Sequence, residues 1–200
     1  MNVVVIGAQW GDEGKGKIVD FLADEASVVT RYSGGANAGH TIVHNDITYK
    51  LHLVPSGIVY PGKTVILGTG MVIDLESLFG ELRTLEEQGV EWKGRVFISE
   101  RAHLIFPSYK QKDLDMEKER RNPIGTTGRG IGVAYAFKAY RDGVRAGDIF
   151  NADVWNTLTE DEKEFINRFK ADLSEMVVDM VSFMAARKDE NKLFEGAQGS

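Results

Sequence analysis

The stretch Gly11-Asp12-Glu13-Gly14-Lys15-Gly16-Lys17 decides how this chain begins to fold. An apolar run, residues 3–6, precedes it, and residues 18–22 follow it with the apolar spacing of a helix. Strand, glycine loop and helix in this order are typical of proteins that hold phosphate, because a helix N-terminus offers free N–H groups to an anion. The first, sixth and seventh residues of the stretch fit the pattern G-x-x-x-x-G-K. We therefore expect a phosphate-binding loop, in which Lys15 and Lys17 meet the negative charge.

The loop departs from the usual phosphate-binding pattern at two positions. Ile18 stands where such loops carry a Ser or Thr that coordinates magnesium, and the carboxylate Asp12 lies inside the loop. Two unit charges of the same sign 4 Å apart repel by about 4 kcal/mol at an effective dielectric constant of roughly 20. Either a divalent cation lies between Asp12 and the phosphates, or Asp12 moves a proton on a second substrate, and the two roles are compatible. Alternatively, Asp12 and Glu13 only stabilise the helix N-terminus, a contribution of about 0.3 to 1 kcal/mol.

The composition restricts the classes of protein to consider. The 200 residues allow one domain with an ordinary core, since 42% of them are hydrophobic. A net charge of -6 argues against nucleic acid or an acidic membrane surface as the main partner. The absence of cysteine excludes disulfides and thiolate zinc sites. No apolar window reaches 18 residues, and no leader-like segment precedes the first strand, so we expect a cytoplasmic protein.

The pattern along the chain is that of an α/β protein. We expect a P-loop-like, mixed but mainly parallel sheet flanked by helices, with an antiparallel hairpin excursion, in one domain covering residues 1–200. Strands are predicted at residues 3–6, 27–32, 65–68, 95–99 and 192–195, a hairpin at 41–54, and helices at 15–24, 75–89, 109–121 and 159–188. In the first helix, Ile18, Phe21 and Leu22 are expected to face inward. In the last helix, Phe165, Phe169, Leu173, Val177 and Val181 are expected to form a core stripe.

Three further segments are candidates for a site. Residues 33–41 follow the second strand, and there Asn37 offers an amide to a base or sugar and His40 can donate a proton. In the glycine cluster 125–132, hydroxyls at Thr126 and Thr127 could hold phosphate with Arg129 or Arg141 nearby, although these glycines could equally be tight turns. The glycine loop 196–200 follows the last strand, and ligands of open α/β sheets bind at carboxyl ends of strands. Three other histidines, which lack metal-like spacing, are expected at edges or on the surface: His44, His52 and His103.

Four separated motifs resemble one known family. They are Gln9-Trp10 with the GDEGKGK that follows, NAGHT at residues 37–41, IGTTGRGIG at 124–132 and FEGAQG at 194–199. Together they make the chain similar to the N-terminal portion of adenylosuccinate synthetases, in the order that the family has. The resemblance implies a cytoplasmic, GTP-dependent ligase that joins IMP and L-aspartate into adenylosuccinate, with release of GDP and phosphate, on the route to AMP.

The resemblance also implies roles for individual residues. Asp12 takes the proton from N1 of IMP, so that O6 attacks the γ-phosphate of GTP, while His40 stabilises the transferring phosphoryl group; aspartate then displaces phosphate from the 6-phosphoryl intermediate. One Mg²⁺ is held by Asp12 and the Gly39 carbonyl. The implied GTP contacts are Gly11, Asp12, Glu13, Gly14, Lys15, Gly16, Lys17, Gly39, His40 and Thr41. The implied IMP contacts are Asp12, Glu13, Gly14, Lys15, Asn37, Ala38, Gly39, His40, Thr127, Arg141 and Gln198, with Arg141 reaching the site of the partner subunit in a homodimer.

The chain departs from the family pattern in two respects, and other functions stay open. The segment between Asp148 and Phe194 is shorter than in common bacterial members, and the family continues past residue 199 with the parts that bind aspartate and guanine.

A nucleotide-binding switch is a second hypothesis, which the Asp12 and His40 pair argues against because a switch needs no proton transfer. A viral relative that uses dGMP is a third, and Asp12 favours IMP. A dinucleotide-dependent oxidoreductase is disfavoured because no G-x-G-x-x-G follows the first strand.

Overall fold

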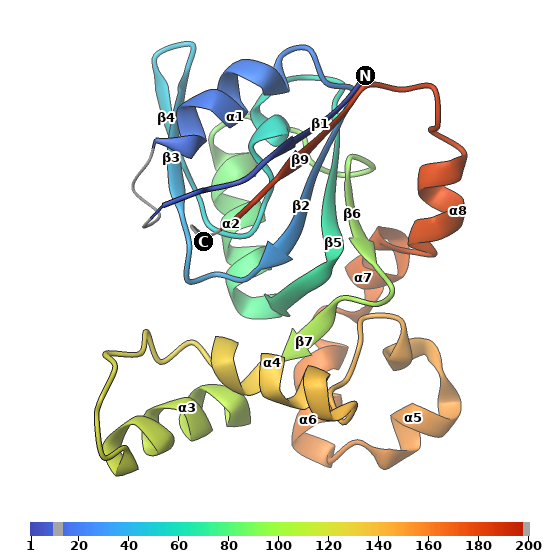
Figure 1. Cartoon of the computed structure of the whole chain (residues 1–200). Coiled ribbons are helices and arrows are strands. Elements are labelled where there is room, and N and C mark those ends of the chain that lie inside the picture. The colour runs from blue at the N-terminus through green and yellow to red at the C-terminus, as the bar shows by residue number, and fades with distance from the viewer. Residues whose placement is uncertain (10–13, 198–200) are drawn as a thin grey trace.

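The computed structural model describes residues 1–9 and 14–197, and a parallel sheet forms its centre (Figure 1). The order across the sheet is β1-β9-β2-β5-β6-β8, and β7 pairs with β5. The strands are β1 (Asn2–Val5), β2 (Val28–Gly34), β5 (Thr64–Asp74), β6 (Val96–Ser99), β7 (His103–Ile105), β8 (Val177–Val178) and β9 (Lys192–Glu195). Each of these strand pairs is parallel. The last strand, β9, therefore lies between the first two, β1 and β2.

Antiparallel strand pairing is concentrated in one hairpin, as predicted. It joins β3 (His40–His44) to β4 (Ile47–Leu51), with His40 opposite Leu51. The two turn residues have φ values of 50° at Asn45 and 62° at Asp46, the left-handed conformation that a two-residue hairpin turn requires and that Asn and Asp tolerate. A short 3-10 helix, η1 (Ser56–Val59), leads from the hairpin to β5.

Helices cover the sheet and build a lobe below it. They are α1 (Lys15–Ala23), α2 (Leu75–Glu87), α3 (Pro107–Glu119), α4 (Ile131–Tyr140), η2 (Asp148–Phe150), α5 (Ala152–Thr157), α6 (Glu160–Asn167), α7 (Lys170–Met176) and α8 (Met180–Ala185). In Figure 1, α3 to α6 lie below the sheet, while α8 lies on the side away from the hairpin. The predicted α/β class is confirmed. None of the described helices has both the length and the apolar character needed to cross a bilayer.

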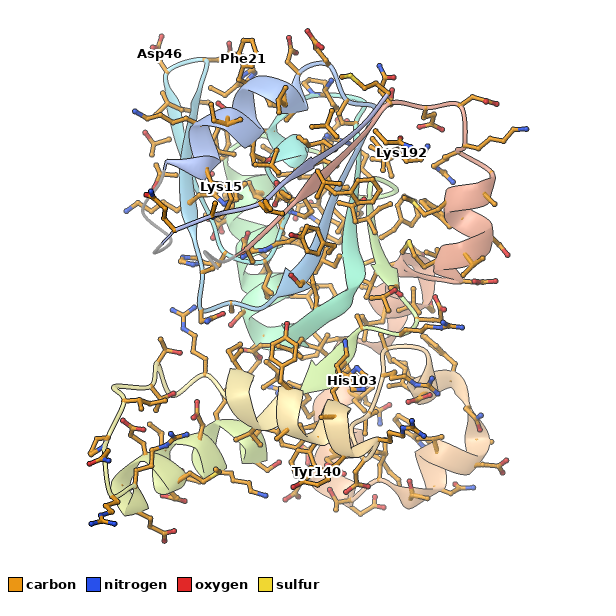
Figure 2. All side chains as sticks on the ribbon, in the orientation of Figure 1. Lys15, Phe21, Asp46, His103, Tyr140 and Lys192 are labelled. Carbon is orange, nitrogen blue, oxygen red and sulfur yellow. The ribbon has the colours of Figure 1, made fainter. Side chains whose placement is uncertain are left out.

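The inward face of α1 differs from the prediction. Val19 and Ala23 are the buried residues of this helix. Ile18 is 56% exposed and Phe21 is 75% exposed, and Figure 2 shows Phe21 at the outer edge of the molecule. Leu22 packs against the core, as predicted. The prediction for Ile18 and Phe21 is wrong because the face of α1 that packs on the sheet is turned by about one residue, so that Val19 and Ala23, four apart, occupy its centre.

The predicted helix at residues 159–188 is divided into several elements. Helices α6 and α7 bury Phe165 and Leu173, but the chain then becomes extended at β8, whose two residues pair with β6. Asp179 restarts a helix, because its side chain accepts a hydrogen bond from the backbone N–H of Val181. Val181 is 67% exposed, so the expected core stripe does not continue to it.

Helix α4 and strand β7, which the sequence pattern did not predict, attach the lower lobe to the sheet. The Tyr135 hydroxyl on α4 accepts a hydrogen bond from the Gly34 N–H at 2.8 Å and donates to the Gly70 carbonyl at 2.9 Å. His103 lies in β7, which pairs with β5 alone among the described strands, but only 9% of it is exposed (Figure 2). The prediction of an edge or surface position is therefore confirmed as to the edge and wrong as to the surface, because α4 and the chain near residue 145 cover this edge.

Candidate active site

A cavity of about 330 Å³ joins three of the sequence motifs. It lies where β1, β2 and β9 end, and one of its lining residues is Lys15, which Figure 2 shows at the start of α1. Its lining residues are Gly14, Lys15, Gly16, Lys17, Val19, Arg31, Ala38, Gly39, His40, Thr41, Glu195, Gly196 and Ala197. The described residues of these three motifs therefore meet at one end of the sheet.

The described part of the first glycine loop, residues 14–17, has the conformation of a helix start. Gly14 has a φ of 78°, a left-handed conformation that favours glycine, and α1 begins at the next residue. The backbone N–H of Lys17 donates to the Gly14 carbonyl at 3.0 Å. A Cβ atom on Gly16 would lie 3.2 Å from Cβ of His40, so this glycine allows the first loop to contact the second. The predicted site residues Gly11, Asp12 and Glu13 lie outside the described residues.

The second loop places His40 against the first. Ala38, Gly39, His40 and Thr41 line the cavity, whereas Asn37 is exposed and does not. Nε2 of His40 is buried and has no hydrogen-bond partner among the described residues. Burial lowers the pKa of His40 below its ordinary value of 6.5, and the Glu195 carboxylate is the strongest charge acting in the opposite direction.

Two buried charges at the cavity were not identified from the sequence. Arg31 and Glu195 are 1% and 2% exposed, and their Cα atoms are partners in the β2–β9 register. The Nη1 group of Arg31 donates to the His52 carbonyl. Oε2 of Glu195 accepts hydrogen bonds from the Ser56 Oγ at 2.7 Å and the Ser56 N–H at 3.3 Å. The available signal was an arginine within the predicted strand that follows the first helix and a glutamate at the end of the predicted last strand.

The third loop reaches the second loop but does not line the cavity. Thr126 donates its hydroxyl to the carboxylate of Asp113 on α3 at 3.0 Å, so this hydroxyl is already engaged by the helix. Arg129 donates through Nη1 to the Ala36 carbonyl, which ties the two loops together. Thr127 is exposed.

Arg141 and Gln198 are two other predicted IMP contacts, and of these the structure describes Arg141. Arg141 is exposed and terminates α4 with a φ of 62°, and it is not among the cavity residues. Gln198 lies outside the described residues. Among residues 1–9 and 14–197, no three or more His, Asp or Glu side chains are grouped so that they could hold a metal ion. The Gly39 backbone, a predicted magnesium ligand, does line the cavity.

Comparisons with known proteins agree on one family. A family model described as adenylosuccinate synthetase matches residues 4–200. The adenylosuccinate synthetase of Aquifex aeolicus is 43% identical over 222 positions, covering 100% of this chain and 51% of the relative. That of Clostridium novyi is 45% identical over 224 positions, covering 98% of this chain and 52% of the relative.

Solved structures agree with this family. The structure of fully ligated adenylosuccinate synthetase from Plasmodium falciparum has a TM-score of 0.84 at 37% identity and covers 98% of this chain and 51% of that one. A cyanophage S-2L succinoaminodeoxyadenylate synthetase, bound to dGMP and dATP, has a TM-score of 0.67 at 23% identity, a likeness of fold alone. The chain spans about half the length of the relatives that it matches. Because the family model matches nearly every residue and the motifs meet at one cavity, this chain belongs to the adenylosuccinate synthetase family.

Proposed function

We propose that this chain is the N-terminal portion of an enzyme that ligates IMP and L-aspartate to adenylosuccinate, with GTP converted to GDP and phosphate. The observation that carries the proposal is that the first glycine loop, the second loop and the FEGAQG segment at the end of β9 line one cavity. Such a ligation needs phosphate contacts and proton-handling groups on the same surface, because one nucleotide must be phosphorylated by another.

GTP phosphates bind at the first loop in this proposal. The N-terminus of α1 offers backbone N–H groups and the positive end of a helix dipole, and Lys15 and Lys17 line the same cavity. Residues 39–41 line the same cavity. The phosphoryl group therefore faces His40, whose side chain can stabilise charge as it develops on the transferring group.

IMP is the acceptor of that phosphoryl group. Asp12 removes the N1 proton, the electron pair shifts to O6, and O6 forms a bond to the γ-phosphorus as the bond to the GDP oxygen breaks. The amino group of aspartate then attacks C6 and displaces phosphate. The family resemblance supports contacts from Asn37, Thr127 and Gln198 to IMP.

A magnesium ion fits the groups that this chain offers. The proposed donors are the Asp12 carboxylate and the Gly39 carbonyl, which are the oxygen ligands that Mg²⁺ prefers. Gly39 lines the cavity together with Lys15 and Lys17, and so lies where phosphate oxygens would complete such a set. When bound, the ion neutralises charge on the phosphates.

Further properties of the whole enzyme are part of the same proposal. These 200 residues form a single α/β domain, and residues beyond it in a chain about twice as long bind aspartate and recognise guanine. The enzyme acts in the cytoplasm as a homodimer, without a nucleic-acid or membrane partner. The exposed position of Arg141 at the end of α4 leaves it free to reach a partner subunit.

The proposal is tested by Asp12→Asn in the full-length enzyme. We expect adenylosuccinate formation from IMP, followed by its absorbance change, to fall at least about 10³-fold, because the amide cannot accept the N1 proton. GTP affinity, measured by calorimetry, should fall only modestly. Lys188→Gln, in the loop before β9, is the matched control and should leave both quantities unchanged, since Lys188 is exposed and lies outside the cavity.

The opposite outcomes are as informative. Retained turnover in Asp12→Asn would refute the base assignment. Turnover of dGMP in place of IMP by the unaltered enzyme would favour the activity of the viral relative. Nucleotide binding with no product from either purine would favour a nucleotide-binding switch.

A further inference from the structure

The cavity contains a buried carboxylate that the proposed reaction does not use. Glu195 is at the end of β9, and its Cα atom is the register partner of Arg31 on β2. Partners in register on neighbouring strands project their side chains to the same face of a sheet. Arg31 and Glu195 therefore lie together beneath the site, and both line the cavity that also contains His40.

Three buried polar atoms at this cavity lack hydrogen-bond partners within the described part of the chain. They are Nε2 of His40, Oε1 of Glu195 and Nε of Arg31. Leaving a buried polar group unpaired costs about 1 to 3 kcal/mol, so such atoms are usually paired in the working state of a protein. A donor on His40 and an acceptor on Glu195 are chemically matched, because a ring N–H can donate to a carboxylate oxygen.

The Glu195 carboxylate is fixed on one side and open on the other. Ser56 engages Oε2 with both its hydroxyl and its backbone N–H. Ser56 therefore fixes the position of the carboxylate, and Oε1 is left as the oxygen that can accept a further hydrogen bond. The other charges that face His40 are Arg31 on β2 and Asp20 and Lys15 on α1, and none of them exceeds Glu195 in its effect on the imidazole.

We infer that Glu195 is a positioning residue for His40: when the site closes on its substrates, Oε1 accepts the Nε2–H of His40, directly or through one water molecule. This contact holds the plane of the imidazole ring, so that the second ring nitrogen, which is also a donor in the protonated ring, faces the transferring phosphoryl group. The inference rests on the proposed function for the identity of that group. A carboxylate behind an imidazole acts in this way in many sites, where it fixes the ring and its tautomer.

A double-mutant cycle in the full-length enzyme tests the contact. Glu195→Gln should lower kcat about 10- to 100-fold, the usual effect of removing such a partner, with KM for IMP and GTP changed less than about threefold. In a His40→Asn background the same substitution should lower kcat less than about threefold, because the ring that it positions is gone. Equal losses in both backgrounds would mean that Glu195 acts only on the structure, and would overturn the inference.

Asp74→Asn is the matched control for removing a buried charge. Asp74 is 4% exposed, has an unpartnered Oδ1 and forms an ion pair with Lys110 at 2.8 Å, but it lines a different cavity. Its substitution should destabilise the protein without coupling to His40. Coupling as strong as that of Glu195→Gln would show that the cycle reports general loosening, and would overturn the inference.

A second measurement requires no turnover. The ¹⁵N resonances of the His40 ring, assigned by their loss in His40→Asn, should shift in Glu195→Gln and stay unchanged in Asp74→Asn with IMP and GTP bound. Glu195→Asp keeps the charge and should therefore have a higher kcat than Glu195→Gln. It also replaces Glu195→Gln in the resonance measurement if the glutamine variant does not fold. His40 ring resonances that have the same chemical shifts in Glu195→Gln as in the unaltered enzyme would overturn the inference. An enzyme that forms no adenylosuccinate would instead overturn the proposed function, while the resonances still decide the contact.

Discussion

Gly34 shows at the residue scale how closely the loops approach one another. It ends β2 with a φ of 98°, and its N–H donates to the Tyr135 hydroxyl. A Cβ atom at this position would lie 2.4 Å from Cβ of Ala197, a distance that requires one of the two segments to move. Gly34 therefore allows the second loop to lie against the glycine loop that follows β9.

Gly34→Ala should lower the free energy of unfolding by at least about 2 kcal/mol, since a left-handed backbone costs about 1 to 2 kcal/mol for alanine and overpacking adds about 1 to 3 kcal/mol. Urea denaturation measures this change. Gly80→Ala, inside α2 with no atom within 4 Å of the added Cβ, is the control and should stabilise the protein by about 1 kcal/mol. An unchanged free energy of unfolding in Gly34→Ala would mean that the two segments are not in contact in solution.

At the scale of elements, one carboxylate attaches the hairpin to α2. Glu81 is 9% exposed and accepts backbone N–H groups of His52 at 3.0 Å, Leu53 at 3.0 Å and Val54 at 3.1 Å. The same His52 residue gives its carbonyl to Arg31. Glu81 thus sets where the chain leaves β4, and with it the position of the second loop, which enters β3 at the same end of the hairpin, where His40 lies opposite Leu51.

Glu81→Gln should lower the free energy of unfolding by about 1 to 3 kcal/mol at pH 7, because a single amide oxygen replaces two carboxylate oxygens and leaves a buried N–H without a partner. Denaturant titration measures it. Glu87→Gln, exposed on the same helix, should stay within about 0.5 kcal/mol of the unaltered protein.

The free energy of unfolding should depend on pH through the pKa of Glu81. Burial raises this pKa above its ordinary value of 4.5, and the backbone hydrogen bonds oppose the rise without cancelling it. In the window above 4.5 the folded state binds more protons at this group than the unfolded state. The contribution of Glu81 to stability is therefore greatest below that value and is lost as pH rises through the raised pKa. The difference in unfolding free energy between the unaltered protein and Glu81→Gln should therefore shrink as pH rises through this window. A difference that grows with pH would contradict the prediction.

At the scale of the whole molecule, the structure exposes apolar side chains on one edge. Among the described strands β1 pairs with β9 alone, and Val4 on it is 61% exposed. Ile6 just beyond β1 is 66% exposed, and on α1 Ile18 and Phe21 are 56% and 75% exposed (Figure 2). Covering one large apolar side chain is worth about 1.5 to 3 kcal/mol, so these residues favour association with another surface.

The 200-residue chain should consequently self-associate at concentrations of about tens of micromolar, the range in which exposed apolar edges aggregate. Sedimentation velocity measures this, and Phe21→Lys should reduce it. Val181→Lys is the control, because Val181 is 67% exposed but lies on α8, away from β1 and α1 (Figure 1). An equal effect of both substitutions would show that net charge, rather than this edge, governs association.

The amino-acid sequence by itself determined the features that depend on neighbouring residues. The turn at Asn45 and Asp46, the start of α1 after Gly14 and most strands follow from local backbone preference and short-period patterns. The loop motifs and their family were also readable from the sequence, and the cavity confirms that residues 14–17 and 38–41 meet. The roles of Asp12, His40 and Gln198 stay predictions.

Only the tertiary structure decided what depends on distant segments. It placed β9 between β1 and β2, and this brought Glu195 beside Arg31 and His40 from a position more than 150 residues away. It left Phe21 exposed and interrupted the predicted last helix at β8, because β6 offered two residues there a strand partner. Local preference is worth less than about 1 kcal/mol per residue, so strand pairing and burial, which the chain order does not reveal, settled these outcomes.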